Sequence, residues 1–353
     1  MLWGLLAILA LILYAVIITA LWYFAKKQNI ANETLLNIPV KREPPLNTPI
    51  KDPIAQKADE AQTLQQTFQK FVPRQFVDHF AMGGAESLKL GYANNDEVAV
   101  MFCDIRGFTG LSEQMTPQQL MNFLNSYFLR MNAPIHDNFG FIDKFIGDAI
   151  MALFDHPNGQ AMHKAADAIN AALGLQKALK LYNHHRSNSG YAAIKNGVGL
   201  HYGPVVLGTV GSDDRMDTTV IGDTVNIAQR IESLTDPLGI DIMASQALVD
   251  EALKHMSFSH RLVDNVVLKG RSTSVDLVEI YEHLPPHEIE QRDASIHLIQ
   301  EGIQLRSARN FKDAITLFKR ACLKYPNDTV LKHHLKVCEE LNYTLEWDGK
   351  VHL

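Results

Sequence analysis

The stretch Val98-Ala-Val-Met-Phe-Cys-Asp-Ile-Arg-Gly-Phe-Thr109 joins an apolar run to a polar end. The apolar run predicts a compact strand in the protein interior. Asp104 stands at the end of that strand, and Gly107 permits a tight backbone approach. Because the backbone amides of residues 105–109 would precede a helix, they could hold phosphate oxygens. An aspartate at such a place can also simply cap a turn, so the stretch alone leaves both interpretations open.

The sequence that follows alternates between helix and strand signals. Residues 117–133 carry apolar side chains at helical spacing. Residues 141–146 and 149–154 predict two strands, and Gly147-Asp148 between them is a hairpin signal. Paired strands interleaved with helices favour an α+β fold in which helices cover one side of an antiparallel sheet.

Two aspartates in these elements could form a metal site. Asp104 and Asp148 would each lie where a strand meets solvent. Two carboxylates, together with water and the oxygens of a substrate phosphate, are ligands that Mg²⁺ prefers. The alternative is that each aspartate only caps its own turn.

A third polar element is Thr219-Val-Ile-Gly-Asp-Thr-Val-Asn-Ile-Ala-Gln-Arg230. Asn226 and Arg230 are one helical turn apart, so their side chains project from the same face of a predicted helix. An amide can orient a sugar, and a guanidinium suits developing phosphoryl charge because its donors form a fixed fork. The alternative is a solvated helix face with Arg230 in a salt bridge.

Together these segments resemble the catalytic domain of the class III adenylate/guanylate cyclases. The motifs that carry the resemblance are Phe-x-Asp-Ile-Arg-Gly-Phe-Thr at 102–109, Lys144-x-x-Gly-Asp148, Gly203, and Thr219-Val-Ile-Gly-Asp-Thr-Val-Asn-x-Ala-x-Arg230. They occur in the family's order between about residues 98 and 281. The resemblance implies a ferredoxin-like, palm-type α+β domain with an antiparallel-rich sheet at residues 93–283.

The resemblance also implies a role for each polar residue. Asp104 and Asp148 would hold two Mg²⁺ or Mn²⁺ ions, with the carbonyl of Ile105 as a further ligand. One ion would lower the pKa of the ribose 3′-hydroxyl, and the other would hold the polyphosphate. Asn226 would position the ribose, and Arg230 would stabilise the phosphate in the transition state.

Further substrate contacts follow from the same resemblance. Gly107, Phe108 and Thr109 would lie against the phosphates, and Lys269 matches the family's polyphosphate-binding lysine. An ordinary exposed lysine at a strand end is the alternative for Lys269.

Base choice depends on Lys144 and Thr219, which match the family's purine-reading positions. Adenylate cyclases carry Lys with Asp or Thr there, whereas guanylate cyclases carry Glu with Cys or a similar residue. A lysine can donate to N1 of adenine, which is an acceptor, whereas N1 of guanine is itself a donor. We therefore expect an adenylate cyclase that converts ATP to 3′,5′-cyclic AMP and pyrophosphate. The alternatives are a guanylate cyclase and a catalytically silent nucleotide-sensing or interaction module.

The resemblance further implies a homodimer. In this family one domain supplies the metal-binding aspartates, and another supplies the base-reading, amide and guanidinium groups. Because this chain carries all of them, a symmetric pair of chains would form two complete sites.

The N-terminal residues predict a membrane anchor. Residues 1–25 contain no charged side chain, a length that can cross a bilayer as a helix, and Lys26 and Lys27 follow directly. We expect residues 1–27 to be a single-pass anchor in the cell (inner) membrane, with the catalytic domain in the cytoplasm. A cleaved signal peptide fits less well because no basic region precedes the apolar run.

Two further segments separate this anchor from the catalytic domain. Residues 28–53 predict a proline-containing linker. Residues 54–92 predict a connecting helical segment, either packed on its own domain or forming a short parallel coiled coil.

Residues 284–353 predict a separate helical region that resembles one tetratricopeptide repeat (TPR) followed by a further helix. Gly302 and Phe318 match positions of the repeat, whereas Arg309 stands where a small residue is usual. Because one repeat cannot bury its own core, the region must pack on the cyclase domain, on a second subunit or on a partner protein.

Bulk composition limits the other possibilities. The chain has 353 residues, enough for two or three domains, with 33 Lys and Arg against 39 Asp and Glu. The resulting net charge of -6 argues against nucleic acid as a partner. Three scattered cysteines indicate neither a disulfide framework nor a zinc site, which fits a reducing compartment.

Overall fold

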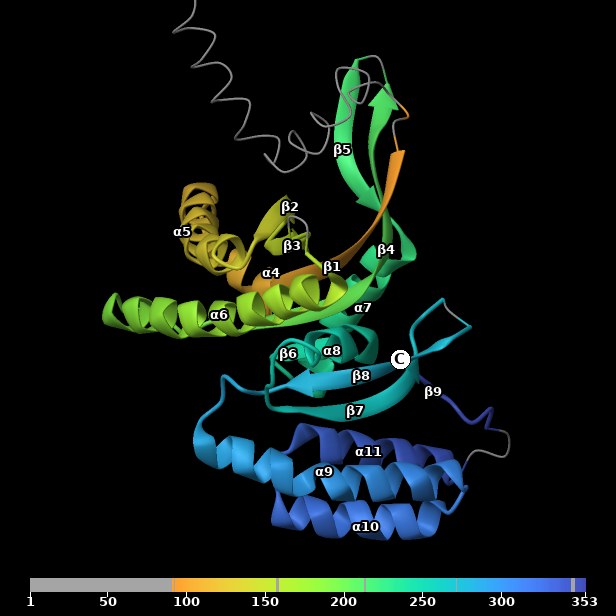
Figure 1. Cartoon of the computed structure of the whole chain (residues 1–353). Coiled ribbons are helices and arrows are strands. Elements are labelled where there is room, and N and C mark those ends of the chain that lie inside the picture. Colours follow the sequence, from red (N-terminus) through yellow and green to blue (C-terminus); the bar gives the residue numbers. More distant parts are fainter. Residues whose placement is uncertain (1–90, 92, 157–158, 213, 271, 344–346) are drawn as a thin grey trace, which may run out of the picture. The chain divides into compact units, whose positions relative to one another are not determined.

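The structure is a computed structural model. It describes residues 91, 93–156, 159–212, 214–270, 272–343 and 347–353. These residues belong to one compact unit (Figure 1). The predicted anchor at 1–27, the linker at 28–53 and nearly all of the connecting segment at 54–92 lie outside the described residues. Among the helices that are described, none combines the length and apolarity needed to span a membrane.

The first half of the domain forms a ferredoxin-like unit. Its elements are β1 (Ala93–Ile105), α4 (Phe108–Ser112), α5 (Pro117–His136), β2 (Gly140–Ile146), β3 (Ala149–Phe154), α6 (Ala161–Asn188) and β4 (Asn196–Ser212). The strands pair antiparallel in the order β2-β3-β1-β4. This order, with a helical crossover after β1 and another after β3, is that of the split βαβ fold. The fold predicted for this part of the chain is confirmed.

The second half extends the same sheet and then adds helices. Its elements are β5 (Arg215–Ile221), α7 (Asp223–Leu238), β6 (Ile242–Ser245), α8 (Gln246–Ala252), β7 (His260–Val267), β8 (Ser274–Ile280), α9 (Pro286–Ser307), α10 (Phe311–Lys324), α11 (Thr329–Leu341) and β9 (Val351–His352). The nine-stranded sheet has the order β2-β3-β1-β4-β6-β8-β7-β9, with β5 on β4. The β4–β6 and β7–β9 pairs are parallel, so the sheet is mixed but mostly antiparallel.

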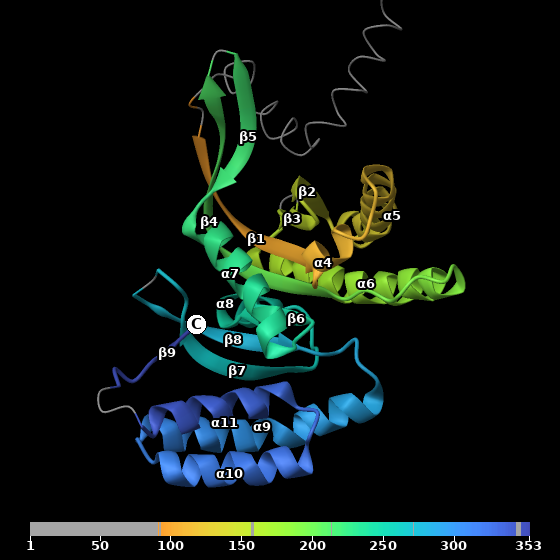
Figure 2. The ribbon, with the colours of Figure 1, turned by 180° about the vertical axis from the view of Figure 1, so that it is seen from behind.

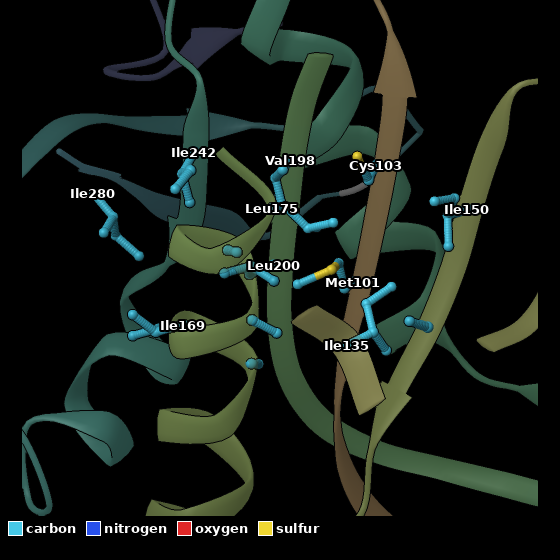
Figure 3. Packing of buried hydrophobic residues seen from close by; sticks show 14 of the residues in the cluster. Met101, Cys103, Ile135, Ile150, Ile169, Leu175, Val198, Leu200, Ile242 and Ile280 are labelled. Atoms are coloured by element: carbon cyan, nitrogen blue, oxygen red, sulfur yellow. The ribbon is translucent and has the colours of Figure 1, made fainter. Parts of the chain in front are cut away.

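Helices cover both faces of the sheet, so the expectation of a sheet covered on one side was wrong. Met101 and Cys103 of β1 pack with residues of α5 and α6, as in Figure 3, whereas Val100 and Phe102 point to the opposite face and cluster with Ala228 of α7. The cause is visible in the strand itself, because its buried residues are apolar without alternation, which is typical of a strand with two covered faces.

Glycine lets α7 lie close to the sheet. A Cβ atom on Gly199 of β4 would lie 2.2 Å from the backbone nitrogen of Glu232 in α7. The helix therefore packs directly on the strand backbone, and its face that bears Glu232 lies beside the end of β1.

The three helices α9, α10 and α11 are confirmed, but they are not separate. They pack on the side of β7 and β8 that faces away from α6 (Figures 1 and 2), in a core shared with Ile231 of α7 and Val263 of β7. Of the packing options that the sequence left open, the α+β domain of the same chain is the one observed. Phe318 fills the space above Gly302, and Arg309 adopts a φ of 60°, a conformation in which small residues are usual.

Two buried ionic clusters fasten these helices to the sheet. Arg261 of β7 bonds Asp328, which caps α11, and also bonds Glu279 of β8. Asp264 of β7 bonds Arg306 of α9 and lies 3.2 Å from the Nε2 atom of His333. Buried charges are tolerated when paired in this way, so both clusters fix the helices in one arrangement on the sheet.

Candidate active site

The two predicted metal-binding aspartates are neighbours at one edge of the domain. Cys103 of β1 pairs with Ile150 of β3, which places Asp104 beside the β2–β3 turn that carries Asp148. Gly147 has a φ of 65° in this turn, a conformation that favours glycine. Because side chains alternate along a strand, Asp104 points to the face that α7 covers.

The carboxyl groups of this pair are close enough to perturb each other. The pKa of Asp148 is raised to about 7 by burial, by a hydrogen bond with Asp104 and by the charge of Asp104. Asp148 Oδ2 is buried and has no hydrogen-bond partner among the described residues. Two adjacent carboxylates with an unpartnered oxygen need a positive counter-charge, so this pair fits a divalent cation. Ile105, whose carbonyl is the further predicted ligand, directly follows Asp104 in the chain.

A third carboxylate lies near the pair. The pKa of Glu232 in α7 is raised to about 7, first by burial and then by the charge of Asp104, although the nearby Arg106 lowers it. Sequence reasoning missed Glu232. Two features of the sequence could have indicated it: Glu232 follows Arg230 by two residues on the same helix, and glycines in β4 let that helix pack closely on the strand.

The segment after Asp104 can offer fewer phosphate-binding amides than the sequence suggested. The amide of Ile105 donates to Asp104 Oδ1 at 3.0 Å, and that of Arg106 donates to the carbonyl of Lys195 at 2.9 Å. The amides that could hold phosphate oxygens are therefore those of Gly107, Phe108 and Thr109, at the start of α4. Gly107 has a φ of 66°, which lets the chain turn into that helix.

The two predicted base-reading residues meet in the structure. Lys144 of β2 donates from Nζ to Thr219 Oγ1 of β5 at 3.1 Å. The ammonium also lies 3.4 Å from Asp143 Oδ2. Lys144 is thus held between a hydroxyl and a carboxylate.

Asp143 is a second residue that sequence reasoning missed. It lies at a β-bulge, its side chain is 1% exposed, and neither of its oxygens accepts a hydrogen bond from the residues that the structure describes. Burial raises the pKa of Asp143, and the charge of Lys144 opposes that shift. A charged residue directly before Lys144 was the available signal, but a bulge that turns it inward is not visible in a sequence.

Asn226 and Arg230 both lie on α7, as predicted, and Arg230 faces the loop after β7. A Cβ atom on Gly270 would lie 3.6 Å from Arg230 Nη2. Lys269, the preceding residue, is exposed. The guanidinium therefore lies beside the loop that carries the predicted polyphosphate lysine.

The acidic pair and the remaining candidates form two separate groups. Within the described ranges, no hydrogen bond or ion pair joins Asp104 or Asp148 to the other group, whose members are Lys144, Thr219, Asn226, Arg230 and Lys269. Within the described part of the chain, the acidic pair and the predicted base- and phosphate-binding residues are thus not joined by hydrogen bonds or ion pairs.

Comparison with known proteins identifies the family. The profile of the family described as the adenylate and guanylate cyclase catalytic domain matches residues 91–281. The chain belongs to this family. An adenylate cyclase of Anabaena cylindrica is 42% identical over 219 residues, which cover 61% of this chain and 42% of that protein. The terminal-differentiation-specific adenylate cyclase of Dictyostelium discoideum is 33% identical over 289 residues, 81% of this chain and 13% of that protein.

The cyclase fold is also seen among solved structures. A bacterial light-regulated adenylyl cyclase superposes with a TM-score of 0.57 at 23% identity, covering 70% of this chain and 68% of that one. This likeness concerns the fold. The aligned part of the chain spans less than half of the length of the two cyclase relatives named above.

Proposed function

We propose that this chain is an adenylate cyclase that forms 3′,5′-cyclic AMP and pyrophosphate from ATP in a homodimer. The observation that carries the proposal is the hydrogen bond between Lys144 and Thr219 in a member of the cyclase family. Besides its contacts with Thr219 and Asp143, the Lys144 ammonium has a third donor for N1 of adenine. The Thr219 hydroxyl oxygen has a second lone pair that can accept from the 6-amino group.

The acidic pair supplies the metal site. Asp104, Asp148 and the Ile105 carbonyl would hold two divalent ions, Mg²⁺ or Mn²⁺, and the unpartnered Asp148 Oδ2 supports that assignment. Such ions lower the pKa of an attacking hydroxyl and neutralise polyphosphate charge. Gly107, Phe108 and Thr109 would bring backbone amides against the phosphates.

The second group orients and stabilises the reacting atoms. The amide of Asn226 would hydrogen-bond the ribose, so that its 3′-oxygen faces the α-phosphorus in line with the leaving pyrophosphate. As the new P–O bond forms and the bond to pyrophosphate breaks, Arg230 donates to the charged α-phosphoryl oxygens. Lys269 would pair with the polyphosphate, and the proton of the 3′-hydroxyl leaves to solvent.

A homodimer completes this arrangement. Because no hydrogen bond or ion pair among the described residues joins the acidic pair to the second group of its own chain, we infer that a two-fold axis brings the acidic pair of one chain opposite the second group of its partner. A pair of chains would then carry two identical sites.

The remaining segments extend the proposal. Residues 1–27 would anchor the chain in the membrane with the catalytic domain in the cytoplasm, which raises the effective concentration of one chain for another. Helices α9–α11 would be a TPR-like region, whose outward surface would be available to a protein partner.

A product assay on the full chain tests the function. Purified protein is given ATP or GTP with Mn²⁺, and both cyclic nucleotides are measured. We expect cyclic AMP as the main product, and we expect Asp104→Ala to abolish it. Equal or greater cyclic GMP would favour a guanylate cyclase, and unchanged cellular function of Asp104→Ala would favour a catalytically silent module.

A further inference from the structure

Residues 347–353, here called the strap, connect the helices to the surface that carries Lys269. The strap begins beside the α9–α10 junction and ends as β9, next to β7 (Figure 1). It therefore joins an element outside the family match to the candidate active site.

The first part of the strap is held by the helices. Arg309 Nη2 donates to the carbonyl of Trp347 at 2.8 Å, and the ring of Trp347 packs edge-on against Phe311 with 5.6 Å between centroids. Trp347 Nε1 then donates to the carbonyl of Lys350 at 2.7 Å, which closes the strap into a tight turn. These contacts tie the conformation of the strap to α9 and α10.

The second part of the strap pairs with the end of β7. Val351 lies opposite Val266 in a parallel ladder and is buried. The amide of Leu353 donates to the carbonyl of Val267 at 3.1 Å, and the amide of Lys269 donates to the carbonyl of Leu353 at 2.9 Å. The backbone of the predicted polyphosphate lysine is thus fixed by the strap.

A side-chain contact fixes the loop a few residues further on. Lys350 Nζ donates to the carbonyl of Ser272 at 3.1 Å. Between these two attachment points lies Gly270, which has a φ of 75°. A Cβ atom on Gly270 would lie 3.6 Å from Arg230 Nη2, so the loop passes beside the guanidinium. A shift of the loop would move Lys269 and open the space beside Arg230 together.

We propose that the strap is a positioning element for Lys269, through which helices α9–α11 control polyphosphate binding. This inference rests on the proposed function. Trp347 and Lys350 are positioning residues, because they act on the loop and not on the substrate. The physical reason is pre-organisation: a loop held in its binding conformation does not lose conformational freedom when the polyphosphate binds.

The test combines strap variants with removal of Lys269 in the full chain. Trp347→Ala removes the ring contact and the Nε1–H bond, and we expect it to raise KM for ATP about 5-fold with a smaller effect on kcat. In a Lys269→Ala background the same change is expected to alter KM by less than about 2-fold, because the residue that it positions is gone. Tyr343→Ala, an aromatic truncation at a site that is 86% exposed on the same helical region, is the matched control and should match wild type.

Lys350→Met is a milder variant that keeps the aliphatic stem and loses the bond to Ser272. It guards against a folding failure of Trp347→Ala, and we expect the same non-additivity with Lys269→Ala. Wild-type KM in both folded strap variants would overturn the inference. Equal loss of activity with and without Lys269 would also overturn it, because it would show a merely structural role. A wild-type chain without cyclase activity would overturn the proposed function itself, which distinguishes the two failures.

Discussion

Lys144 on β2 donates a hydrogen bond to the hydroxyl oxygen of Thr219 on β5, although these strands are not neighbours in the sheet. The bond joins the two positions that we propose to read the purine. It also sets the direction of the ammonium: with one donor on Thr219 and another toward Asp143, the third can reach an acceptor on the base.

Changing both residues to the pair typical of guanylate cyclases should change the substrate. Lys144→Glu with Thr219→Cys places an acceptor where adenine N1 is also an acceptor. A mispaired group in a closed pocket costs about 1–3 kcal/mol, so kcat/KM for ATP should fall about 10-fold or more relative to that for GTP. Parallel measurement of both cyclic products checks this. Lys336→Glu, at a side chain that is 76% exposed, is the charge-matched control and should keep the wild-type ratio.

Asp143 should show opposite effects on stability and on activity. Its buried carboxylate lacks a well-formed hydrogen bond, so Asp143→Asn removes a desolvated charge and should raise stability by about 1 kcal/mol. The same change removes the carboxylate beside Lys144, so KM for ATP should rise. Thermal unfolding and steady-state kinetics on the same preparation test both effects. A variant with lower stability and unchanged KM would contradict this account of Asp143.

The pair of raised carboxyl pKa values predicts how pH and metal act together. The pKa of Asp148 rises from 3.8 and that of Glu232 from 4.5, both to about 7. Between the ordinary and the raised pKa values, the folded state therefore binds more protons than the unfolded state. The free energy of unfolding of the metal-free protein therefore falls as pH rises through that window. Divalent ions bind the deprotonated carboxylates, so added Mn²⁺ should raise Tm more at pH 8 than at pH 5.5.

The control for this linkage is Asp148→Asn, because other groups also titrate in the same range. The difference in stability between wild type and Asp148→Asn isolates the contribution of the pair. That difference should favour the variant at pH 8 in the presence of a chelator, and Mn²⁺ should reverse it. An Mn²⁺-induced Tm shift of the same size at both pH values would count against a metal site at Asp104 and Asp148.

Local patterns predicted much of the fold and of the candidate site. The apolar run of β1, the Gly147-Asp148 turn and the helical face with Asn226 and Arg230 are each determined by residues close together in the chain. The sequence analysis did not predict that helices cover both faces of the sheet, although the unbroken apolar run of β1 is typical of a strand with two covered faces.

Contacts between distant residues could not be predicted in this way. Asp264, Arg306 and Asp328 are charged residues that usually indicate a solvated surface, yet all three are buried because partners far away in the sequence neutralise them. Strand β9 comprises Val351–His352, too short for any periodicity, and it exists because β7 offers a free edge.

The buried cluster around Asp264 should be essential for the attachment of the helices. Asp264 accepts bonds from Arg306, which also donates to Nδ1 of His334. The His334 ring donates from Nε2 to the carbonyl of Val263, and burial lowers its pKa to about 4. A ring that accepts at Nδ1 and donates at Nε2 is neutral. Asp264→Asn leaves the Arg306 charge without its counter-ion, and breaking a buried pair costs about 3–5 kcal/mol.

Chemical denaturation of the full chain measures this loss. Lys319→Ala breaks the exposed pair with Glu339 on the same helices and should cost less than about 1 kcal/mol, as surface pairs do. If α9–α11 act on the active site through the strap, partial detachment of the helices in Asp264→Asn should raise KM for ATP before the catalytic domain unfolds. Loss of stability with KM unchanged throughout the pre-transition range would show that the helices are fastened to the sheet without influencing the site.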